Sequence, residues 1–454
     1  METIFEAGRE IPVKGHWDVI VVGGGTAGSI AGIAAAREGA KTLIVEDNGF
    51  LGGSATASLV TPLMSNHVEG KPLNTGIGLE VMERLSQSGD CGAIYNNLGY
   101  FNWEMLKFTL EEMYLEANGE LLYHTHFAAP IMEGKQIKGI IVENKSGRLA
   151  LLGTVIIDAS GDGDVAHLAG APIEAGDEDG KNQAMSLRFS VANIDINKFA
   201  DFLSTLDGYK QDIRFLHTAH VNGKRYSITP LFEKAYAEGV LKEDDGDYFQ
   251  IFGVPGRPNE LGFNCPRISN KTDGTNIDHL TNAQIEGRVR IKRLLNFMKK
   301  FFPGFENSYI GAVASMVGIR ESRRVRGEYY LTESDYYEAK KFPDAIARNR
   351  YPIDVHSHKK GGGVKFQSHI PENEYHEIPY RALVPLEVEN LLVAGRCISA
   401  SFNAEASIRI QPNCHAMGQA AGVAAALAIK ENTTVRKLDG VKVRETLKAR
   451  GANL

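Results

Sequence analysis

The sequence predicts an α/β protein: a Rossmann-like dinucleotide-binding domain with a β-meander, and an inserted α+β domain with an antiparallel sheet. Three observations lead to this prediction. A glycine-rich turn near the start of the chain joins an apolar strand to a helix of small residues. Two later apolar strands, one near residue 157 and one near residue 392, also run into glycine. A long segment with its own strands and a long helix separates those two strands.

The first strand and its turn have the pattern of a dinucleotide-binding fingerprint. Residues 18–22 (DVIVV) are an apolar run, typical of a buried parallel strand, and Gly23, Gly25 and Gly28 follow with GxGxxG spacing. The first glycine permits the tight turn, the second lets a pyrophosphate approach the backbone, and the third lets helix and strand pack closely. The N-terminus of the next helix also attracts phosphate through its amides and dipole.

The second strand predicts how the ribose is bound. It spans residues 41–45 and ends at Glu46, 18 residues after Gly28. A carboxylate there can accept both hydroxyls of an adenosine ribose and would repel a 2′-phosphate, which disfavours NADP. The small residues at 49–56 (GFLGGSAT) would let a flavin ring approach the backbone beyond the pyrophosphate. An ordinary loop is the alternative for this segment.

Two further strands reach glycine later in the chain. Residues 121–127, 137–143 and 149–157 alternate or run apolar, which predicts a β-meander. Its last strand enters the turn IIDASGDGD, and the strand at 390–394 enters Gly395 ahead of a helix rich in alanine and glycine. Three such junctions around one nucleotide are the usual arrangement for an extended FAD. A large α/β protein with glycine turns and no flavin is the alternative.

These stretches resemble the FAD-dependent oxidoreductase family, whose flavin domain is similar to those of fumarate reductase flavoproteins and glutathione reductase. The resemblance runs from about residue 9 to 428 and is carried by REIPVKGHWDVIVVGGGTAGSIAGIAAAREGA, GFLGGSATA, VIIDASGDGDVAHLAG, GIRESRRVRGEYYLT, YPIDVH and NLLVAGRCISAS…SIRIQPNCHAMGQAAG. It implies an FAD domain formed by residues 1–174 and 386–454, with a substrate or cap domain at 175–385. Family members often carry a His after the ISAS-like segment, where this chain has Phe402 and Asn403.

The resemblance and the strand ends together predict the residues that border a non-covalent FAD. They are Gly23, Gly25, Thr26, Ala27, Gly28, Glu46, Asp47, Gly52, Gly53, Ser54, Phe127, Ala159, Ser160, Gly161, Asp164, Gly395, Arg396, Arg409 and Met417. No His lies directly before the Gly52–Gly53 segment, so covalent attachment is not expected. A single fingerprint without CxxC argues against a pyridine-nucleotide disulfide reductase.

The inserted segment is expected to form a sheet that covers the flavin. Residues 185–191, 248–254 and 261–268 are predicted strands, and Thr281 with Gln284 fits a capping box for a helix that reaches about Phe302.

The stretch YPIDVHSH at 351–358 contains the best acid–base candidates. In an extended segment His356 and His358 would share a face, with Asp354 as an orienting acid, although metal binding also fits this array. If His356 takes a substrate proton, the rate should rise with pH through a transition near neutrality.

Arginines and the last glycine junction supply further candidates. Arg320 could stabilise a reduced anionic ring or clamp a substrate carboxylate, while Arg323 and Arg324 are expected in a structural ion-pair network. Asn413 is a candidate cap of the C-terminal glycine–alanine helix, and His415 is expected near the flavin pyrimidine.

Composition narrows the class of protein. A chain of 454 residues with 43% hydrophobic and 23% charged residues is typical of a globular protein, and a net charge of -6 gives no reason to expect nucleic-acid binding. No apolar run is long enough to span a bilayer, and no cationic apolar leader precedes Trp17, which predicts a cytoplasmic protein. Four scattered cysteines argue against an iron–sulfur cluster or structural zinc, and no metal is expected.

The predicted function is that of an FAD-dependent oxidoreductase acting on a small molecule. It would transfer a hydride between flavin N5 and a small polar substrate, with oxidation of a hydroxylated carbon in a sugar, polyol or hydroxy acid as the leading reaction. Reduction of an activated C=C bond is one alternative. A non-catalytic FAD-binding or assembly subunit, which a basic patch at 288–300 would favour, is another. The electron acceptor is unknown, and a homo-oligomer is compatible with the sequence.

Overall fold

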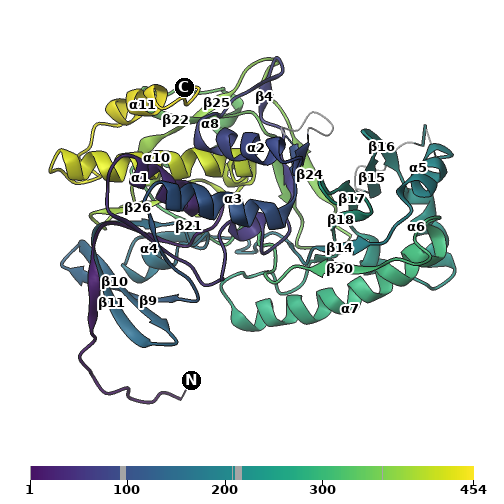
Figure 1. Cartoon of the computed structure of the whole chain (residues 1–454), viewed down its shortest axis with the longest axis horizontal. Coiled ribbons are helices and arrows are strands. Elements are labelled where there is room, and N and C mark those ends of the chain that lie inside the picture. The colour runs from purple at the N-terminus through teal and green to yellow at the C-terminus, as the bar shows by residue number, and fades with distance from the viewer. Residues whose placement is uncertain (1, 93–98, 207, 210–216, 360) are drawn as a thin grey trace.

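The computed structural model describes residues 2–92, 99–206, 208–209, 217–359 and 361–454. The predicted fold class is confirmed, because a mainly parallel sheet and a separate, mainly antiparallel sheet are both present (Figure 1).

The nucleotide-binding sheet has seven strands in the order β8-β2-β1-β11-β10-β9, with β26 beside the end of β11. The strands β8, β2, β1, β11 and β26 are parallel, and β10 and β9 continue the sheet as antiparallel strands. Their bounds are β1 (Val13–Val22), β2 (Thr42–Val45), β8 (Glu120–Leu122), β9 (His126–Glu133), β10 (Gln136–Asn144), β11 (Gly147–Asp158) and β26 (Leu391–Val393). The predicted strand at 121–127 is therefore divided between β8 and β9.

Both faces of this sheet are covered, which explains why β1 reads as a continuous apolar run. Val19 and Val21 belong to one core with the helices α1 (Gly28–Arg37) and α10 (Gln411–Lys430), while Ile20 and Val22 belong to a core on the other face. A Cβ at Gly418 would lie 2.1 Å from the carbonyl oxygen of Ala27. The small residues of α10 therefore let it pack directly on the backbone of α1 (Figure 1).

The inserted sheet has six strands in the order β16-β15-β17-β18-β14-β20. It is antiparallel except for the pair β15–β17, which is parallel. Its strands and the helices of the same segment are β14 (Phe189–Ala192), β15 (His217–Val221), β16 (Lys224–Ser227), β17 (Phe249–Gly253), β18 (Glu260–Asn264), β20 (Tyr309–Val313), α5 (Ile196–Ser204), α6 (Thr229–Ala237) and α7 (Ile277–Phe301). In Figure 1, α7 runs beneath this sheet.

The long helix α7 begins earlier than predicted. Its cap is Asn276, whose side chain accepts hydrogen bonds from the amides of Asp278 and His279. The proposed capping box at Thr281 and Gln284 lies inside the helix and was wrong, because an asparagine with an extended backbone at 276 already satisfies the first free amides.

Residues 342–384 pack differently from the rest of the inserted segment. Phe342, Ile346, Ile378 and Val384 belong to the same core as α10, although the sequence assigns them to the inserted domain. The boundaries at 174 and 385 stay a prediction.

The remaining elements of the described chain lie outside the two large sheets. They are α2 (Ile77–Gln87), α3 (Trp103–Glu116), α4 (Asp164–Leu168), α8 (Glu333–Tyr337), α9 (Phe402–Ile408), α11 (Gly440–Ala449), β3 (Pro62–Leu63), β4 (His67–Val68), β5 (Lys71–Pro72), β6 (Cys91–Gly92), β7 (Gly99–Phe101), β12 (Ile173–Ala175), β13 (Met185–Ser186), β19 (Arg267–Ile268), β21 (Arg323–Val325), β22 (Ala345–Asn349), β23 (Ile353–His356), β24 (Val364–Gln367) and β25 (His376–Pro379), with 3₁₀ turns η1 (Gly53–Ala55), η2 (Glu243–Gly246) and η3 (Tyr380–Leu383). Among the described residues, no helix combines the length and the apolar character needed to cross a bilayer.

Candidate functional site

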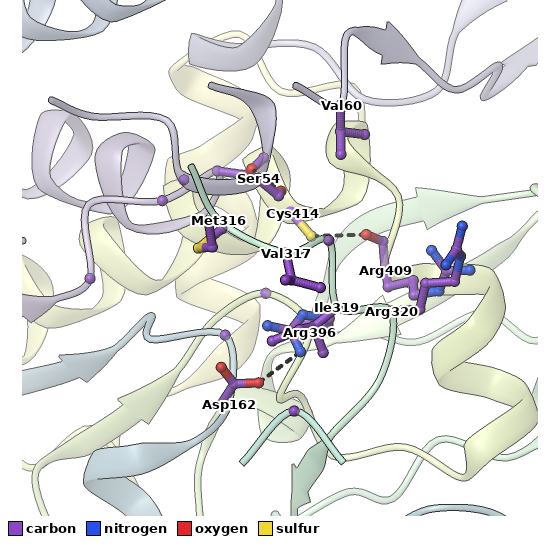
Figure 2. Close-up of a pocket in the computed structure, with 18 of the residues that line it drawn as sticks. Ser54, Val60, Asp162, Met316, Val317, Ile319, Arg320, Arg396, Arg409 and Cys414 are labelled. Atoms are coloured by element: carbon purple, nitrogen blue, oxygen red, sulfur yellow. Dashed lines mark hydrogen bonds and ion pairs between the residues drawn. The ribbon is translucent and has the colours of Figure 1, made fainter. Parts of the chain in front are cut away.

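A cavity of about 1420 Å³ is lined by residues from the nucleotide-binding sheet, from the inserted sheet and from the first turns of α7 and α10. The turn after β1, the end of β2, the turn after β11 and the turn after β26 all contribute to its wall. The predicted strand-to-glycine junctions therefore meet at one site. Figure 2 shows Ser54, Arg396, Arg320 and Arg409, which come from distant parts of the chain, around this space.

The glycines of the fingerprint have different tasks. A Cβ at Gly23 would lie 2.6 Å from the carbonyl oxygen of Ala159, and a Cβ at Gly28 would lie 1.8 Å from the carbonyl oxygen of Gly23. These two positions need glycine for internal packing. A Cβ at Gly25 would meet only the Cα of Gly53, at 3.7 Å, and would occupy open space at the cavity wall. Glycine at this position keeps room for a bound group.

Glu46 lies in the cavity wall and is 6% exposed. Its Oε2 accepts from the amide of Gly24 at 2.8 Å, and its Oε1 accepts from the amide and the side chain of Asn48 at 2.8 and 2.7 Å. Burial raises the pKa of Glu46, although the hydrogen bonds from Asn48 and Gly24 oppose this. The protein uses three of the roughly four acceptor positions of a carboxylate, which leaves about one for a ribose hydroxyl instead of the predicted two.

Most of the predicted cofactor residues line the cavity. They are Gly23, Gly25, Thr26, Ala27, Glu46, Asp47, Gly53, Ser54, Phe127, Ala159, Ser160, Gly161, Asp164, Gly395, Arg396 and Arg409. Gly28, Gly52 and Met417 do not. Gly28 supports the turn, Gly52 has a φ of 106° before η1, and Met417 is fully buried in the core around α1 and α10.

Arg396 is held by an ion pair at the end of β11. Its Nη1 donates to Oδ1 of Asp162 at 2.8 Å, as the dashed line in Figure 2 shows. Arg323 pairs with Asp164 at 2.7 Å, and Arg324 pairs with Glu321, so both belong to an ion-pair network as expected.

A polar cluster lies where β23 meets the cavity. Asp354 and His356 are two residues apart on β23, and both line the cavity together with Arg320 and Arg409. Nε2 of His356 lies 3.2 Å from Oδ1 of Asp354, and Nη2 of Arg409 lies 3.6 Å from Oδ2 of the same aspartate. The amide of His356 donates to Oε1 of Gln183, which holds the backbone of this histidine.

The cluster has one ionised acid and one neutral histidine at neutral pH. Burial and the charge of Arg320 lower the pKa of His356 to about 3, although Asp354 opposes them. Burial would raise the pKa of Asp354, but His356, Arg409 and Arg320 lower it to about 2. Nδ1 of His356 is buried and has no hydrogen-bond partner within the described part of the chain.

His358 is not part of this cluster, and the expectation that it shares a face with His356 was wrong. β23 ends at His356, and Nδ1 of His358 lies 3.7 Å from Oδ2 of Asp177, outside the cavity wall. In the described ranges no three His, Cys, Asp or Glu side chains form a group that could hold a metal ion.

One expectation at α10 was also wrong. The residue before its first turn is Ile410, and Asn413 lies inside the helix, where its side chain bonds with Asn66, Asn74 and Asn349. His415 is buried outside the cavity wall, where a Cβ at Gly78 would touch its ring.

Sequence reasoning missed several polar residues of the inserted sheet. Arg188, Tyr248, Gln250 and Asn264 all line the cavity. One signal was available, because Arg188 is the one charged residue in the predicted strand at 185–191.

The match to one known family agrees with this geometry. The model of a family described as "FAD dependent oxidoreductase" matches residues 18–447. Similar solved structures include a geranylgeranyl bacteriochlorophyll reductase-like protein from Thermoplasma acidophilum, at 13% identity and TM-score 0.45, covering 96% of this chain and 84% of that chain. They also include p-nitrophenol 4-monooxygenase PnpA from Pseudomonas putida DLL-E4, at 12% identity and TM-score 0.41, covering 96% and 84%. No curated protein matches.

The residues present fit FAD. Gly25 leaves space at the cavity wall where a phosphate needs close approach, and α1 points its N-terminus at this space. Glu46 retains an acceptor position for the ribose, and Gly53, whose Cβ would lie 2.7 Å from the Cα of Gly25, keeps the second loop against the first. The cofactor of this chain is FAD.

Proposed function

The chain belongs to the FAD-dependent oxidoreductase family, and from this membership we propose that it oxidises a hydroxylated carbon of a small polar substrate. The observation that carries the proposal is the Asp354–His356 pair in the cavity wall, whose free imidazole nitrogen has no partner among the described residues. When bound, FAD supplies the hydride acceptor for this chemistry.

His356 is suited to take the hydroxyl proton. With ionised Asp354 3.2 Å from Nε2, we assign the imidazole proton to Nε2, which leaves the lone pair of Nδ1 without a partner among the described residues. A substrate hydroxyl placed at Nδ1 would give its proton to the ring as the hydride leaves the carbon that bears this hydroxyl. Asp354 then stabilises the imidazolium, as the aspartate of a hydrolase triad does.

The protonation state favours oxidation over reduction of a C=C bond. Reduction needs a group that donates a proton to carbon, and a histidine whose pKa is lowered to about 3 is unprotonated at neutral pH. An unprotonated histidine can accept a proton, which is the role that alcohol oxidation requires, although its lowered pKa also makes it a weaker base.

The basic face of α7 gives little support to an assembly subunit. Arg290 pairs with Glu286, Arg293 with Asp245, and Lys300 with Glu238. Three of the six basic side chains at 288–300 are therefore compensated within the chain, which weakens the case for an anionic partner at this patch.

The test is anaerobic reduction of the bound flavin by candidate substrates. Sugars, polyols and hydroxy acids are added to the yellow holoenzyme, and loss of the flavin absorbance is followed by stopped flow. We expect one of these classes to bleach the flavin. If none does, while chemically reduced enzyme is reoxidised by an activated alkene, the C=C alternative replaces the proposal.

A further inference from the structure

Arg188 is a buried cation in the cavity wall without an acidic partner. It is 7% exposed and follows β13, and its Nη1 donates to the carbonyl oxygen of Leu59 at 3.3 Å. Within the described chain, no carboxylate oxygen lies within 4.0 Å of its guanidinium. Burial lowers the pKa of Arg188 to about 10, so it stays charged at neutral pH.

A second buried arginine lies beside it in the same wall. Nη2 of Arg320 donates to Oγ of Ser186 at 3.0 Å, and Nη1 donates to the carbonyl oxygen of Ala184. Ser186 and Arg188 are two residues apart, so this bond brings Arg320 to the segment that carries Arg188. Arg320 is 9% exposed and also has no carboxylate within 4.0 Å among the described residues.

The nearby acid does not compensate these charges. Asp354 is the carboxylate of the cluster, and it is already in contact with His356 and Arg409. Arg188, Arg320 and Arg409 carry three positive charges against this one negative charge. Buried charges are normally paired because leaving them unpaired costs several kcal/mol, on the order of the stability of a whole domain.

The missing partner is best supplied by a ligand. A guanidinium presents parallel N–H donors that match a carboxylate, and such pairs are the strongest hydrogen bonds in proteins. The wall near Arg188 also carries neutral polar groups: Tyr248, Gln250 and Asn264, whose Oδ1 is buried without a partner in the described residues. These groups suit the hydroxyls of a small polar molecule that carries one anionic end.

We propose that Arg188 and Arg320 bind the carboxylate of the substrate, which makes the substrate a hydroxy acid and not a sugar or a polyol. This inference rests on the proposed oxidation of a hydroxylated carbon. Arg188 holds the anionic end, and His356 faces the same cavity to receive the hydroxyl proton.

Binding to the oxidised holoenzyme tests the anion site without any reaction. Malonate is compared with malonamide, and tartrate with threitol, by calorimetry and by the shift in flavin absorbance. In each pair only the charged groups are replaced by neutral ones. We expect the carboxylates to bind at least tenfold more tightly than their neutral partners, and this preference to disappear in Arg188→Gln. Arg188→Lys keeps the positive charge but loses the parallel N–H donors of the guanidinium, so it should retain part of the preference for carboxylates.

Thermal unfolding separates a binding role from a structural one. Arg188→Gln should keep FAD and unfold at no lower temperature than the parent, because it removes a buried unpaired charge. Malonate should raise the unfolding temperature of the parent and not of the variant. The control is Arg257→Gln, which removes a charge from outside the cavity wall, where Arg257 pairs with Glu260 at 2.8 Å. It should leave malonate binding unchanged.

The two proposals fail in different ways. Equal binding of charged and neutral probes, no binding of any carboxylate, or unchanged malonate affinity in Arg188→Gln would overturn the anion site. A loss of FAD affinity in Arg188→Gln with intact malonate binding would also overturn it. If malonate binding depends on Arg188 but no sugar, polyol or hydroxy acid bleaches the flavin, the anion site stands and the oxidation proposal fails.

Discussion

Oδ1 of Asp354 and Nε2 of His356 lie 3.2 Å apart in the wall of the FAD cavity, and both residues are less than a tenth exposed. The two side chains project from the same face of β23, where period-two alternation places residues i and i+2 together. This pair orients one imidazole and leaves its other nitrogen free, and it determines the first two predictions.

Replacing His356 by Asn should leave FAD bound, because none of the glycine junctions is changed. Reduction of the flavin by the substrate should slow by roughly 10²–10⁴-fold, the range typical of a lost general base. Stopped-flow absorbance measures this rate. His358→Asn is the matched control, since His358 lies outside the cavity wall, and it should change the rate less than threefold or so. If His356→Asn slows reduction by less than tenfold, the Asp354–His356 pair is structural.

The pH dependence should differ from that of an exposed histidine. The sequence alone predicts a transition near neutrality, but burial and Arg320 lower the pKa of His356 to about 3. The rate of flavin reduction should therefore show no transition from this residue between about pH 5 and pH 8. A transition in that range that disappears in His356→Asn would contradict the pKa that the buried position implies.

The same shift affects stability in acid. Because the folded-state pKa of His356 is depressed, its contribution to stability is complete above about pH 6.5 and is lost as pH falls towards 3. Chemical denaturation at pH 7 and pH 4 should show a smaller loss of unfolding free energy in His356→Asn than in the parent.

Glu405 should make the protein less stable in alkali. It is fully buried in α9, neither carboxylate oxygen has a hydrogen-bond partner among the described residues, and burial raises its pKa to about 8, against the opposing charge of Arg409. The folded state keeps this proton while the unfolded state releases it near pH 4.5, so stability is complete below that pH and falls as pH rises towards 8.

Glu405→Gln removes this dependence. At pH 8.5 the variant should be more stable than the parent by a few kcal/mol, on the order expected from a shift of several pH units, and at pH 4.5 the two should be similar. Urea denaturation at both pH values, with saturating FAD, measures this difference. A variant that is less stable at pH 8.5 would mean that the ionised carboxylate is stabilised by its neighbouring arginines.

Local sequence patterns predicted the elements that depend on neighbouring residues. The turn from β1 to α1 is specified by the fingerprint glycines Gly23, Gly25 and Gly28, and Glu46 follows because β2 must end at the same edge of the sheet. The close packing of α10 on α1 was visible as a run of glycine and alanine. Asp354 and His356 could be placed together because alternation in a strand is a local rule.

The errors come from boundaries and from contacts between distant segments. His358 was misplaced because β23 ends at His356, where its pairing with β24 ends, and no residue type marks that end. Asn276 and Thr281 are both good caps, so the start of α7 depended on packing. Arg188 belongs to the site only because the inserted sheet faces the FAD domain, which no local pattern specifies.

Glu46 should contribute to FAD affinity through about one ribose contact. Glu46→Ala should weaken FAD binding by at least tenfold, since a hydrogen bond to a charged group is worth about 1.5–3 kcal/mol. It also removes the acceptor for the amides of Gly24 and Asn48, so Glu46→Gln is the better comparison. The glutamine keeps one acceptor oxygen and should lose less affinity. Fluorescence of the released flavin at equilibrium gives the FAD dissociation constants of the parent and of the two variants. Equal constants in all three proteins would show that FAD does not use Glu46.

Gly28 and Gly25 have the most different surroundings among the fingerprint glycines. Their alanine variants therefore distinguish an effect on folding from an effect on FAD binding. A Cβ at Gly28 would lie 1.8 Å from the carbonyl oxygen of Gly23, so Gly28→Ala should destabilise the apoprotein by about 1–3 kcal/mol, as overpacking does. A Cβ at Gly25 meets no atom closer than 3.7 Å, so Gly25→Ala should leave the unfolding free energy of the apoprotein within about 0.5 kcal/mol of the parent.

Gly25→Ala should weaken FAD binding although it leaves the unfolding free energy nearly unchanged, because Gly25 faces the cavity. The methyl group of Gly25→Ala occupies the space that a phosphate needs, so FAD should bind at least tenfold more weakly to a protein that is still folded. Urea denaturation of the apoproteins and titration with FAD give the two quantities for each variant. If Gly25→Ala binds FAD as tightly as the parent, the phosphates do not approach the backbone at this turn, and the open space in front of Gly25 has another use.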